Sequence, residues 1–486
     1  MTDNWDVIVI GAGPVGENAA QYAIQGSGRT AALIEAELVG GECSYWACMP
    51  SKALLNPGEV LDRARHVPGV AELVGERELA VGPVLARRDR VVSDLDDAGQ
   101  VAWATGAGIE VIRGRGELIG EKRVRVTSSA GTRELVARHA VVLATGTTAS
   151  IPDVPGLAAA LPWTSRDATN LHEVPRRMVI IGGGVVAAEA ATWLLSLGVA
   201  ELTILGSAPE LLGRMEPFAG QSVREQLSER GGTVRVGATV VAVDRQQPSD
   251  TGVGQVHGGP VTVTYRADGE QHTVTADEVL VAAGRRPASS DLGLDHLGVP
   301  VDRGFVTVDE HLTVPGLPWL YAVGDVNGKA LLTHMGKYQA RIAGAVIAAR
   351  AEGREPAGPW FSDAPAAVPQ VTFTDPQVGS VGQTLDAALS AGLDAVAVDQ
   401  DLAALAGTYV ARENYRGRAR IVVDRAAGMI VGATFVGPEI AELVHAATVA
   451  VVGRVPLTTL WHAVPSYPTV SEVWLRLLES VFNPSS

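Results

Sequence analysis

Short apolar runs alternate with longer helical patterns along most of the chain. Residues 6–10 form a continuous apolar run with a single leading acid, residues 17–25 follow a helical pattern, and residues 31–34 are again apolar. A buried strand, a helix and a second buried strand of these lengths are typical of a βαβ unit in a parallel sheet. The pattern therefore predicts an α/β fold with a sheet that is covered on both faces.

Glycines fill the turn between the first strand and its helix. Gly11, Gly13 and Gly16 follow the strand directly, and Glu35 ends the second strand. In such a turn the first glycine permits the tight bend, the second lets a pyrophosphate approach the backbone, and the third lets helix and strand pack closely. An acid at the end of the second strand can bind a ribose hydroxyl. The alternative is a plain glycine-rich turn, but the spacing of strand, helix and acid favours a dinucleotide site.

A second copy of this pattern follows later in the chain. The apolar run at 178–181 leads into a helical run at 186–197 and another apolar run at 202–205, and the turn holds Gly182, Gly183 and Gly184, with Ala187 in the position of the third glycine. Two mononucleotide-binding units predict two dinucleotides. The alternative is a Rossmann-like unit that has lost its ligand.

The second strand of the second copy ends without an acid. Gly206 and Ser207 stand where a carboxylate would favour NAD, and Arg214 follows several residues later. Because an acid there binds the ribose 2′-hydroxyl and an arginine accommodates a 2′-phosphate, the pattern leans weakly towards NADPH. Arg214 could equally be a solvated surface residue.

Length and charge narrow the class of protein. The chain has 486 residues, which predicts two to four domains, and a net charge of −15, which argues against nucleic acid and anionic membrane partners. No apolar run is long enough to cross a membrane, and the polar N-terminal residues carry no signal sequence. We therefore expect a cytoplasmic enzyme with no membrane partner.

The chain contains two cysteines, Cys43 and Cys48, shortly after Glu35. Two cysteines in a long chain are too few for a secreted disulfide scaffold or a structural zinc site. Pro50 suits the first turn of a helix, so Cys48 should lie near a helix N-terminus, where the dipole stabilises a thiolate. The pair could form a bridge, or the cysteines could be inert core residues.

The cysteine segment resembles the class I pyridine nucleotide–disulfide oxidoreductases, a family that includes dihydrolipoamide dehydrogenase, glutathione reductase, mercuric reductase and soluble transhydrogenases. That family has two glycines, a spaced Cys pair and a Pro-[Ser/Thr]-Lys ending, and residues 40–52 keep every fixed position. The resemblance continues through the segments at 144–146, 283–287, 307–325, 332–334, 371–376 and 381–382.

The resemblance implies FAD and NAD(P)H as cofactors, and a role for each matching residue. Cys43 would attack the substrate, Cys48 would lie beside the flavin, and Lys52 would pair with Glu189 near flavin N5. The predicted catalytic residues are Cys43, Cys48, Lys52, Glu189, Tyr467 and Glu472. The predicted cofactor-binding residues are Gly11, Gly13, Gly16, Glu35, Gly41, Lys52, Gly116, Thr145, Gly146, Gly182, Gly184, Glu189, Gly284, Gly324, Asp325, Thr333 and His334, and no metal site is expected.

The chain departs from the family at its acid/base. Disulfide reductases of the family carry a histidine before a proline near the C-terminus, and here Tyr467 replaces it. Because the side-chain pKa of histidine is about 6.5 and that of tyrosine is about 10, tyrosine is a poor base at neutral pH. His462 could substitute or be a surface residue, and Glu472 could merely hold Tyr467. Tyr45 and Trp46, between the cysteines, favour core packing over an aromatic acceptor site.

The predicted architecture has two Rossmann-like dinucleotide-binding domains and an α+β C-terminal dimerisation domain. FAD would bind residues 1–155 and 286–350, NAD(P) residues 156–285, and the homodimer would form through 351–486. The predicted function is electron transfer from NAD(P)H through FAD and the cysteine pair to a low-molecular-weight disulfide. A quinone reductase, diaphorase or soluble transhydrogenase is the alternative, because none of these needs the missing histidine. A non-catalytic flavoprotein is disfavoured by the retained cysteines, Lys52 and Glu189.

Overall fold

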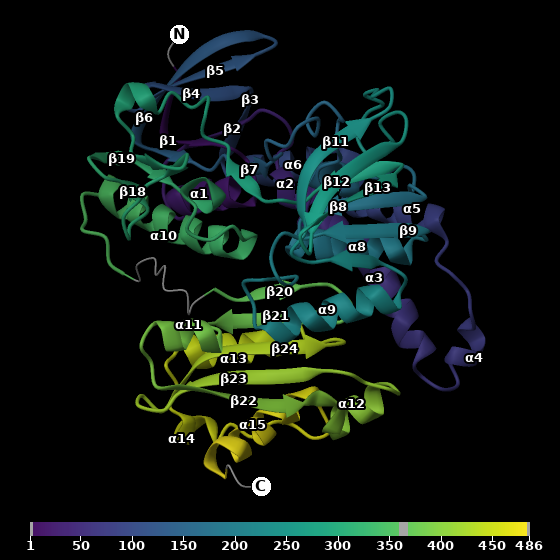
Figure 1. Ribbon diagram of the computed structural model, residues 1–486. Helices are drawn as coiled ribbons and strands as arrows, with labels where there is room; N and C mark the ends of the chain where they lie inside the picture. The colour runs from purple at the N-terminus through teal and green to yellow at the C-terminus, as the bar shows by residue number, and fades with distance from the viewer. Residues whose placement is uncertain (1–2, 359–367, 484–486) are drawn as a thin grey trace. The chain divides into compact units, whose positions relative to one another are not determined.

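The computed structural model describes residues 3–358 and 368–483. The chain forms two compact units, each built from separate segments: the first from residues 1–50, 88–150 and 285–363, and the second from residues 51–87, 151–284 and 364–486. Figure 1 traces their helices and strands. The four-segment domain division stays a prediction, since these units group the chain by contact and not by ligand.

An eight-stranded sheet forms the centre of the first unit. Strand β1 (Asp3–Ile10) lies between β2 (Ala31–Glu35) and β6 (Gly131–Leu143) and pairs in parallel with both. β19 (Leu317–Ala322) pairs in parallel with β6, and β3 (Ile109–Arg113) with β2. Because the carboxyl ends of parallel strands meet at one edge, the residues that follow β1, β2 and β19 gather there. The remaining strands are β18 (Thr313–Val314), β4 (Arg115–Gly120) and β5 (Arg123–Ser128).

Two helices of this unit pack closely against each other. Helix α1 (Pro14–Ile24) follows β1 and contacts α10 (Thr333–Ala351), and the two lie side by side in Figure 1. The backbones of the two helices approach each other closely at Gly344, because a Cβ on this residue would lie 2.5 Å from the Tyr22 Cβ. The other elements of this unit are α2 (Gly41–Tyr45), α6 (Ala98–Gly106), β7 (Thr147–Ala149), β15 (Arg285–Pro287), β16 (Val301–Asp302) and β17 (Phe305–Val306).

The second unit contains a four-stranded parallel sheet in the order β10-β9-β8-β14. Helix α8 packs on β8 and β9, and its buried face joins a core that includes Trp163 and Trp193. These strands are β8 (Arg177–Ile181), β9 (Glu201–Leu205), β10 (Thr233–Arg235) and β14 (Glu278–Val281), beside an antiparallel sheet of β11 (Thr239–Arg245), β12 (Val261–Ala267) and β13 (Glu270–Ala276). The helices are α4 (Ala71–Val74), α7 (Ser165–Thr169), α8 (Val185–Ser196) and α9 (Pro217–Glu229), while α3 (Cys48–Arg65) and α5 (Val81–Val91) each continue across a unit boundary.

A five-stranded antiparallel sheet forms the C-terminal part of the second unit. Helices α13 (Leu443–Val452) and α15 (Val473–Phe482) share one apolar core with this sheet, and α11 (Leu385–Ser390) belongs to a separate small cluster. This arrangement is α+β, as the sequence predicts for residues after 351. The strands are β20 (Gln370–Thr372), β21 (Gln377–Gly382), β22 (Ala395–Asp401), β23 (Arg418–Asp424) and β24 (Met429–Gly437), with short helices α12 (Ala406–Ala411) and α14 (Leu457–Leu460).

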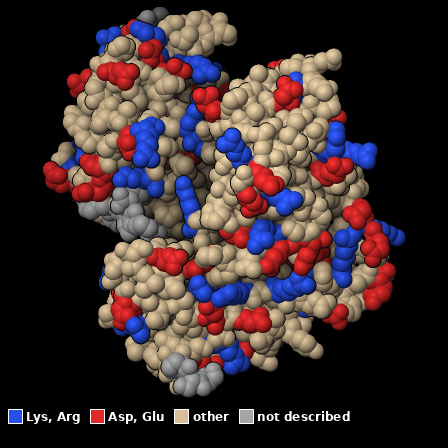
Figure 2. Space-filling model, in the orientation of Figure 1, with Lys and Arg blue, Asp and Glu red and all other residues tan. Residues whose placement is uncertain are grey.

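Surface charge is mixed in sign. On the face drawn in Figure 2, Lys and Arg side chains are interspersed with Asp and Glu, and no single-sign patch dominates. Within residues 3–358 and 368–483, no helix has both the length and the apolar character needed to span a bilayer.

Candidate active site

The first glycine-rich turn of the sequence lies between β1 and α1. Gly11 has φ +100°, and a Cβ there would lie 2.5 Å from the Ala144 carbonyl oxygen; a Cβ on Gly16 would lie 1.9 Å from the Gly11 oxygen. Both positions therefore require glycine for packing. Gly13 differs, because a Cβ there would meet nothing within 4 Å, and this residue forms the N-cap of α1 without a capping side chain. The turn thus offers an open backbone surface at a helix N-terminus, which suits a pyrophosphate.

Glu35 ends β2 beside this turn. Its carboxylate accepts hydrogen bonds from the backbone N–H of Ala12 at 2.8 Å and of Glu37 at 2.7 Å. Burial raises the pKa of Glu35 above its ordinary value, although both hydrogen bonds oppose that shift. The side chain is therefore fixed at the strand end, where a ribose hydroxyl can reach it.

Asp325 follows β19 at the same edge of the sheet. The Thr147 hydroxyl donates a hydrogen bond of 2.7 Å to its carboxylate, and the Arg285 Nε lies 4.0 Å away. Burial raises the pKa of Asp325 against the effects of Thr147 and Arg285. The nearby Thr145 hydroxyl is buried and has no hydrogen-bond partner in the described part of the chain. Sequence reasoning missed Thr147 and Arg285; the only available signal was the segment at 283–287, which by resemblance marks a domain exit.

These residues fit FAD. They combine an open glycine turn, a fixed acid at the ribose position, a buried aspartate and an orphaned hydroxyl along one sheet edge. Two further predicted residues serve packing: a Cβ on Gly41 would lie 2.8 Å from the Gly13 Cα, and one on Gly116 would lie 3.0 Å from an Ile10 side-chain carbon. Gly146 has φ +71° and Gly324 φ +76°, both in turns that bring the chain to this edge.

The cysteine pair lies on two successive helices of the chain. Cys43 is in α2, Cys48 begins α3, both side chains are half-buried, and no bridge joins them. The hydrogen bond to Cys48, followed by burial, raises the pKa of the Cys43 thiol. The two thiols are therefore close enough to share a hydrogen bond.

Thr333, at the start of α10, contacts the pair. Its Oγ1 lies 3.4 Å from the Cys48 Sγ. The neighbouring His334 is exposed. The structure therefore brings Cys43, Cys48 and Thr333 together, as the positions in the sequence predict.

Tyr45 is a core residue. Its ring is 1% exposed, and its hydroxyl donates to the Val39 carbonyl oxygen at 3.1 Å. Trp46 packs edge-on against it with ring centroids 5.8 Å apart. The packing interpretation of this aromatic pair is thus confirmed for Tyr45.

Lys52 and Glu189 form an ion pair in the second unit. The Lys52 Nζ lies 2.8 Å from one Glu189 carboxylate oxygen and 3.1 Å from the other. Glu189 also accepts from the Phe373 N–H at 2.9 Å, and the Lys52 ammonium lies 4.7 Å from the Phe373 ring centroid. The lysine side chain is 37% exposed and the glutamate side chain 6%. Both oxygens of the buried carboxylate therefore have hydrogen-bond partners.

The second glycine-rich turn repeats the geometry of the first. Gly182 has φ +131°, and a Cβ there would lie 2.3 Å from the Ala282 oxygen, whereas Gly184 and Gly284 meet nothing within 4 Å. Gly184 is the N-cap of α8 and has no capping side chain. The backbone at this turn is therefore open in the same way as at Gly13.

No acidic residue ends β9 in the way that Glu35 ends β2. The Gly206 N–H donates to the Arg235 carbonyl at 2.9 Å, so Arg235 on β10 lies beside the end of β9. Arg235 and Arg214 are both exposed.

The C-terminal site residues do not meet one another. Tyr467 is 76% exposed. Glu472 is buried and accepts from Arg476 at 3.0 Å, while its second oxygen has no partner in the described chain. The suggestion that Glu472 holds Tyr467 is therefore wrong. His462 is exposed, in keeping with a surface residue.

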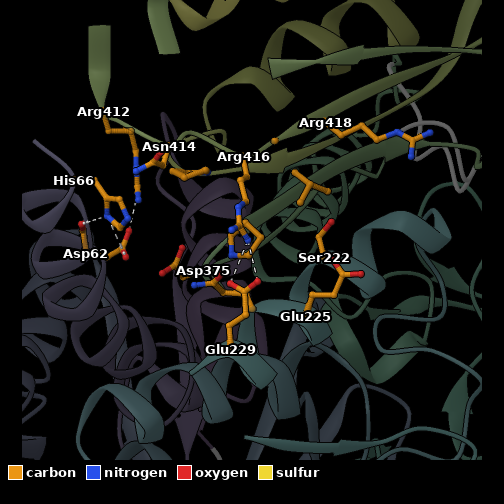
Figure 3. Close-up of a pocket in the computed structure, with 15 residues that line it drawn as sticks. Asp62, His66, Ser222, Glu225, Glu229, Asp375, Arg412, Asn414, Arg416 and Arg418 are labelled. Atoms are coloured by element: carbon orange, nitrogen blue, oxygen red, sulfur yellow. Dashed lines mark hydrogen bonds and ion pairs between the residues drawn. The ribbon is translucent and has the colours of Figure 1, made fainter. Parts of the chain in front are cut away.

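A cavity of about 350 Å³ lies within the second unit, but none of the predicted site residues lines it. Figure 3 shows charged side chains from α3, α9 and the segment after α12 around it, and some of them are joined in ion pairs. Arg412 lies 2.7 Å from Asp62, and Arg416 lies 2.9 Å from Glu229. Two arginines of the lining are thus each paired with an acid of the lining. Within the described residues, no group of three or more His, Cys, Asp or Glu side chains is placed to hold a metal.

Comparison with protein families gives two matches that cover most of the chain. The family described as pyridine nucleotide-disulphide oxidoreductase matches residues 5–353, and its dimerisation domain matches residues 368–477. The chain is 32% identical over 474 residues to dihydrolipoyl dehydrogenase of Chlorobaculum tepidum, covering 97% of this chain and 96% of that protein. It is also 32% identical over 476 residues to the enzyme of the same name from Chlamydia pneumoniae, covering 98% and 96%.

Solved structures show the same fold. The HOCl-induced flavoprotein disulfide reductase RclA from Escherichia coli, in its Cu(II) complex, has a TM-score of 0.82 at 24% identity and covers 99% of this chain and 100% of that one. LpdA from Mycobacterium tuberculosis has a TM-score of 0.82 at 25% identity with the same coverage. The likeness extends over the whole chain.

Proposed function

Because the chain belongs to the pyridine nucleotide-disulphide oxidoreductase family, we propose that its Cys43–Cys48 pair carries electrons from NAD(P)H to a low-molecular-weight disulfide. The family makes the protein an NAD(P)H-dependent flavin oxidoreductase. The observation that carries the finer proposal is the cysteine pair itself, with Cys43 in α2, Cys48 at the start of α3 and the Thr333 hydroxyl 3.4 Å from the Cys48 sulfur. Two thiols in different surroundings can divide the work of attack and electron entry.

The residues at the first turn would hold FAD. Gly13 and the N-terminus of α1 would receive the pyrophosphate, Glu35 the adenosine ribose, and Asp325 with Thr147 the opposite end. FAD bound there would supply two-electron chemistry between NAD(P)H and the Cys43–Cys48 disulfide. Lys52 would lie near the flavin as a fixed positive charge, oriented by Glu189.

The cysteines would then act in sequence. Cys43 would attack the acceptor disulfide as a thiolate, which breaks the acceptor S–S bond, forms a mixed disulfide and releases the first acceptor thiol. Cys48 would resolve it by attacking the Cys43 sulfur, which releases the second acceptor thiol.

We also propose that the second glycine-rich turn prefers NADPH over NADH. Gly206 and Ser207 provide no carboxylate to repel a 2′-phosphate, and Arg235 lies beside Gly206. Arg214 is a second exposed cation on the loop that follows β9. An arginine near this strand end accommodates the phosphate of NADP.

A homodimer completes the proposal, since the chain carries the family's dimerisation domain. Large apolar side chains are exposed in that domain, including Val449 at 54%, Val452 at 56% and Val464 at 84%. Tyr467 lies in the same C-terminal segment, so contact with a second copy would cover it and bring it to the partner's site. A cytoplasmic location would keep Cys43 and Cys48 reducible.

One experiment separates disulfide reduction from the alternatives. Cys43→Ser should lower turnover with disulfides by roughly 10³-fold or more, because a hydroxyl is a poor nucleophile at neutral pH. Ser44→Ala, one position along the same helix, is the matched control and should keep its activity. Both variants are assayed with NADPH and NADH against small disulfides and against quinones.

The second candidate function is a quinone reductase or transhydrogenase. The observation that favours it is Tyr467 in place of the histidine that disulfide exchange uses. Quinone or transhydrogenase turnover that survives Cys43→Ser, with no disulfide turnover in the unmodified enzyme, would support this function and overturn the first.

A further inference from the structure

The cavity of about 350 Å³ in the second unit has the size of a small-molecule site, since ligand pockets in proteins measure about 300–1,000 Å³. Its lining carries charges of both signs, with four acids and three arginines among the residues that Figure 3 draws. A simple anion would face the acids and a simple cation would face the arginines. The mixed lining therefore suits a ligand that itself carries both charges.

Arg412 is the most buried arginine of this lining. Its side chain is 9% exposed, whereas that of Arg416 is 79% exposed and that of Arg418 is 44% exposed. The Arg412 Nη1 donates a hydrogen bond of 2.7 Å to Asp62, but its Nε is buried and has no partner in the described part of the chain. Because every nitrogen of a guanidinium can donate, Arg412 keeps unused donors, and a buried donor without a partner costs free energy.

Asp375 is a largely buried acid of the same lining, with a side chain that is 18% exposed. Burial raises the pKa of Asp375 above its ordinary value, and Asp62 raises it further, while Arg230, Arg412 and His66 lower it. The Arg230 Nη1 is 3.6 Å from the carboxylate, which is too long for a hydrogen bond. Among the described residues, the Asp375 carboxylate therefore has no hydrogen-bond donor.

Arg412 and Asp375 line one cavity without pairing with each other. No hydrogen bond or ion pair joins these two described side chains, although both are largely buried and their charges are opposite. Direct contact would be the simplest way to compensate their loss of water. A ligand that reaches both groups can compensate them instead, because a carboxylate matches the planar guanidinium and an ammonium group matches the aspartate.

Part of the lining is apolar. Pro376, Val436 and Pro438 contribute to the wall, and Pro376 follows Asp375 directly in the chain. An aliphatic group of the ligand could cover this surface and remove it from water, which is favourable without any polar partner. The lining thus combines a donor for a carboxylate, an acceptor for an ammonium group and a surface for an aliphatic side chain.

We propose that this cavity binds a neutral α-amino acid with an aliphatic side chain. Its carboxylate accepts hydrogen bonds from Arg412, its ammonium group donates to Asp375, and its side chain lies against the apolar part of the wall. None of the residues predicted to bind the cofactors or to exchange disulfides lines the cavity. Amino-acid binding is therefore a property beyond electron transfer.

The test is isothermal titration calorimetry of the flavin-loaded, full-length protein with L-leucine, 4-methylpentanoate and 3-methylbutylamine. The second ligand is leucine without its amino group, and the third is leucine without its carboxylate. L-leucine should bind saturably with a Kd of about 1 mM or lower. Each analogue should bind at least about tenfold more weakly, because it leaves one buried charge without a partner. Absence of saturable leucine binding, or an analogue that binds as tightly as leucine, overturns the proposal.

Two substitutions each remove one recognition group. Arg412→Gln should weaken leucine binding by about tenfold or more, to the level of 3-methylbutylamine. Asp375→Asn should weaken it by a similar factor, to the level of 4-methylpentanoate. Arg425→Gln and Asp394→Asn are the matched controls, because they remove the same side chains from an exposed ion pair outside the cavity. Both controls should bind leucine as the unmodified protein does.

Flavin absorbance reports the folding of each variant. Arg412→Lys serves in case Arg412→Gln folds poorly: it keeps a positive charge beside Asp62 but loses the planar fork, and should weaken leucine binding severalfold. Folded Arg412 and Asp375 variants that bind leucine as tightly as the controls overturn the proposal. Calorimetry needs no electron acceptor, so this result is independent of whether the protein reduces disulfides.

Discussion

Each glycine-rich turn leads into a helix that withdraws one glutamate carboxylate from water within its first two turns, Glu17 in α1 and Glu189 in α8. Glu189 has Lys52 at 2.8 Å and the Phe373 N–H at 2.9 Å, whereas the buried Glu17 Oε1 has no partner in the described chain. A paired buried carboxylate holds its neighbour in place. An unpaired one titrates near neutral pH, and such groups cluster where protons are moved. Similar helices after similar turns therefore serve different chemistry.

The third glycine position gives the largest predicted difference between the turns. Gly16→Ala should destabilise the protein by about 3 kcal/mol or more and abolish flavin binding, because the new Cβ would lie 1.9 Å from the Gly11 oxygen. Ala187→Gly, at the matching position of the second turn, should cost only about 1 kcal/mol. Urea unfolding and bound flavin measure both effects, and equal losses would contradict the packing argument.

Glu17→Gln gives the next largest effect, and it depends on pH. A carboxyl whose folded-state pKa lies at about 7, against an ordinary 4.5, loses stability as pH rises between these values, because the folded state resists ionisation. Below about pH 4.5 the variant and the unmodified protein should be equally stable, and above pH 7 the variant should be more stable by up to about 3 kcal/mol. Urea unfolding across this range measures the difference. A constant difference at all pH values would show that Glu17 does not titrate there.

Lys52→Met tests whether pairing is what separates the two glutamates. The variant leaves the Glu189 carboxylate buried with the Phe373 N–H alone, and should cost about 2 kcal/mol at neutral pH, less than a fully buried pair because Lys52 is 37% exposed. Urea unfolding at neutral pH measures the loss. Lys122→Met is the control for loss of a lysine. A Lys52→Met variant as stable as Lys122→Met would contradict the comparison.

The residues at the ends of β2 and β9 differ as well, and this difference gives the smallest predicted effect, a change in nucleotide preference. Gly206→Asp supplies the second turn with an acid like Glu35, and its Cβ would lie 3.5 Å from the Gly183 Cα, an ordinary contact. We expect the ratio of kcat/KM for NADPH over NADH to fall by about tenfold, because the carboxylate repels a 2′-phosphate and binds a 2′-hydroxyl. Arg235→Gln should lower the same ratio without improving NADH. An unchanged ratio in both variants would contradict the proposed preference for NADPH.

Much of the fold could be predicted because its signals are local. Apolar runs, helical periods and glycine spacings identified both dinucleotide-binding units, and the resemblance of the chain to its family supplied the cysteine roles and the pairing of Lys52 with Glu189. Gly11 and Gly16 are constrained by steric contacts between neighbouring segments of one βαβ unit, so their spacing in the sequence carries the information.

The parts that could not be predicted depend on contacts between distant segments. Glu17 stands on a helix with no local sign of its burial, and only the approach of α10 places Lys337 near it. Closeness in sequence suggests that Glu472 holds Tyr467, yet Glu472 pairs with Arg476 on the same helical face.

The sequence alone determined that this chain holds two dinucleotide-binding turns and one redox cysteine pair, because backbone geometry at glycines and a fixed cysteine motif are written in short stretches. The tertiary structure decided which buried carboxylates have partners. Glu189 and Glu17 are alike in sequence, and what separates them is whether a cation within hydrogen-bond distance compensates the loss of water.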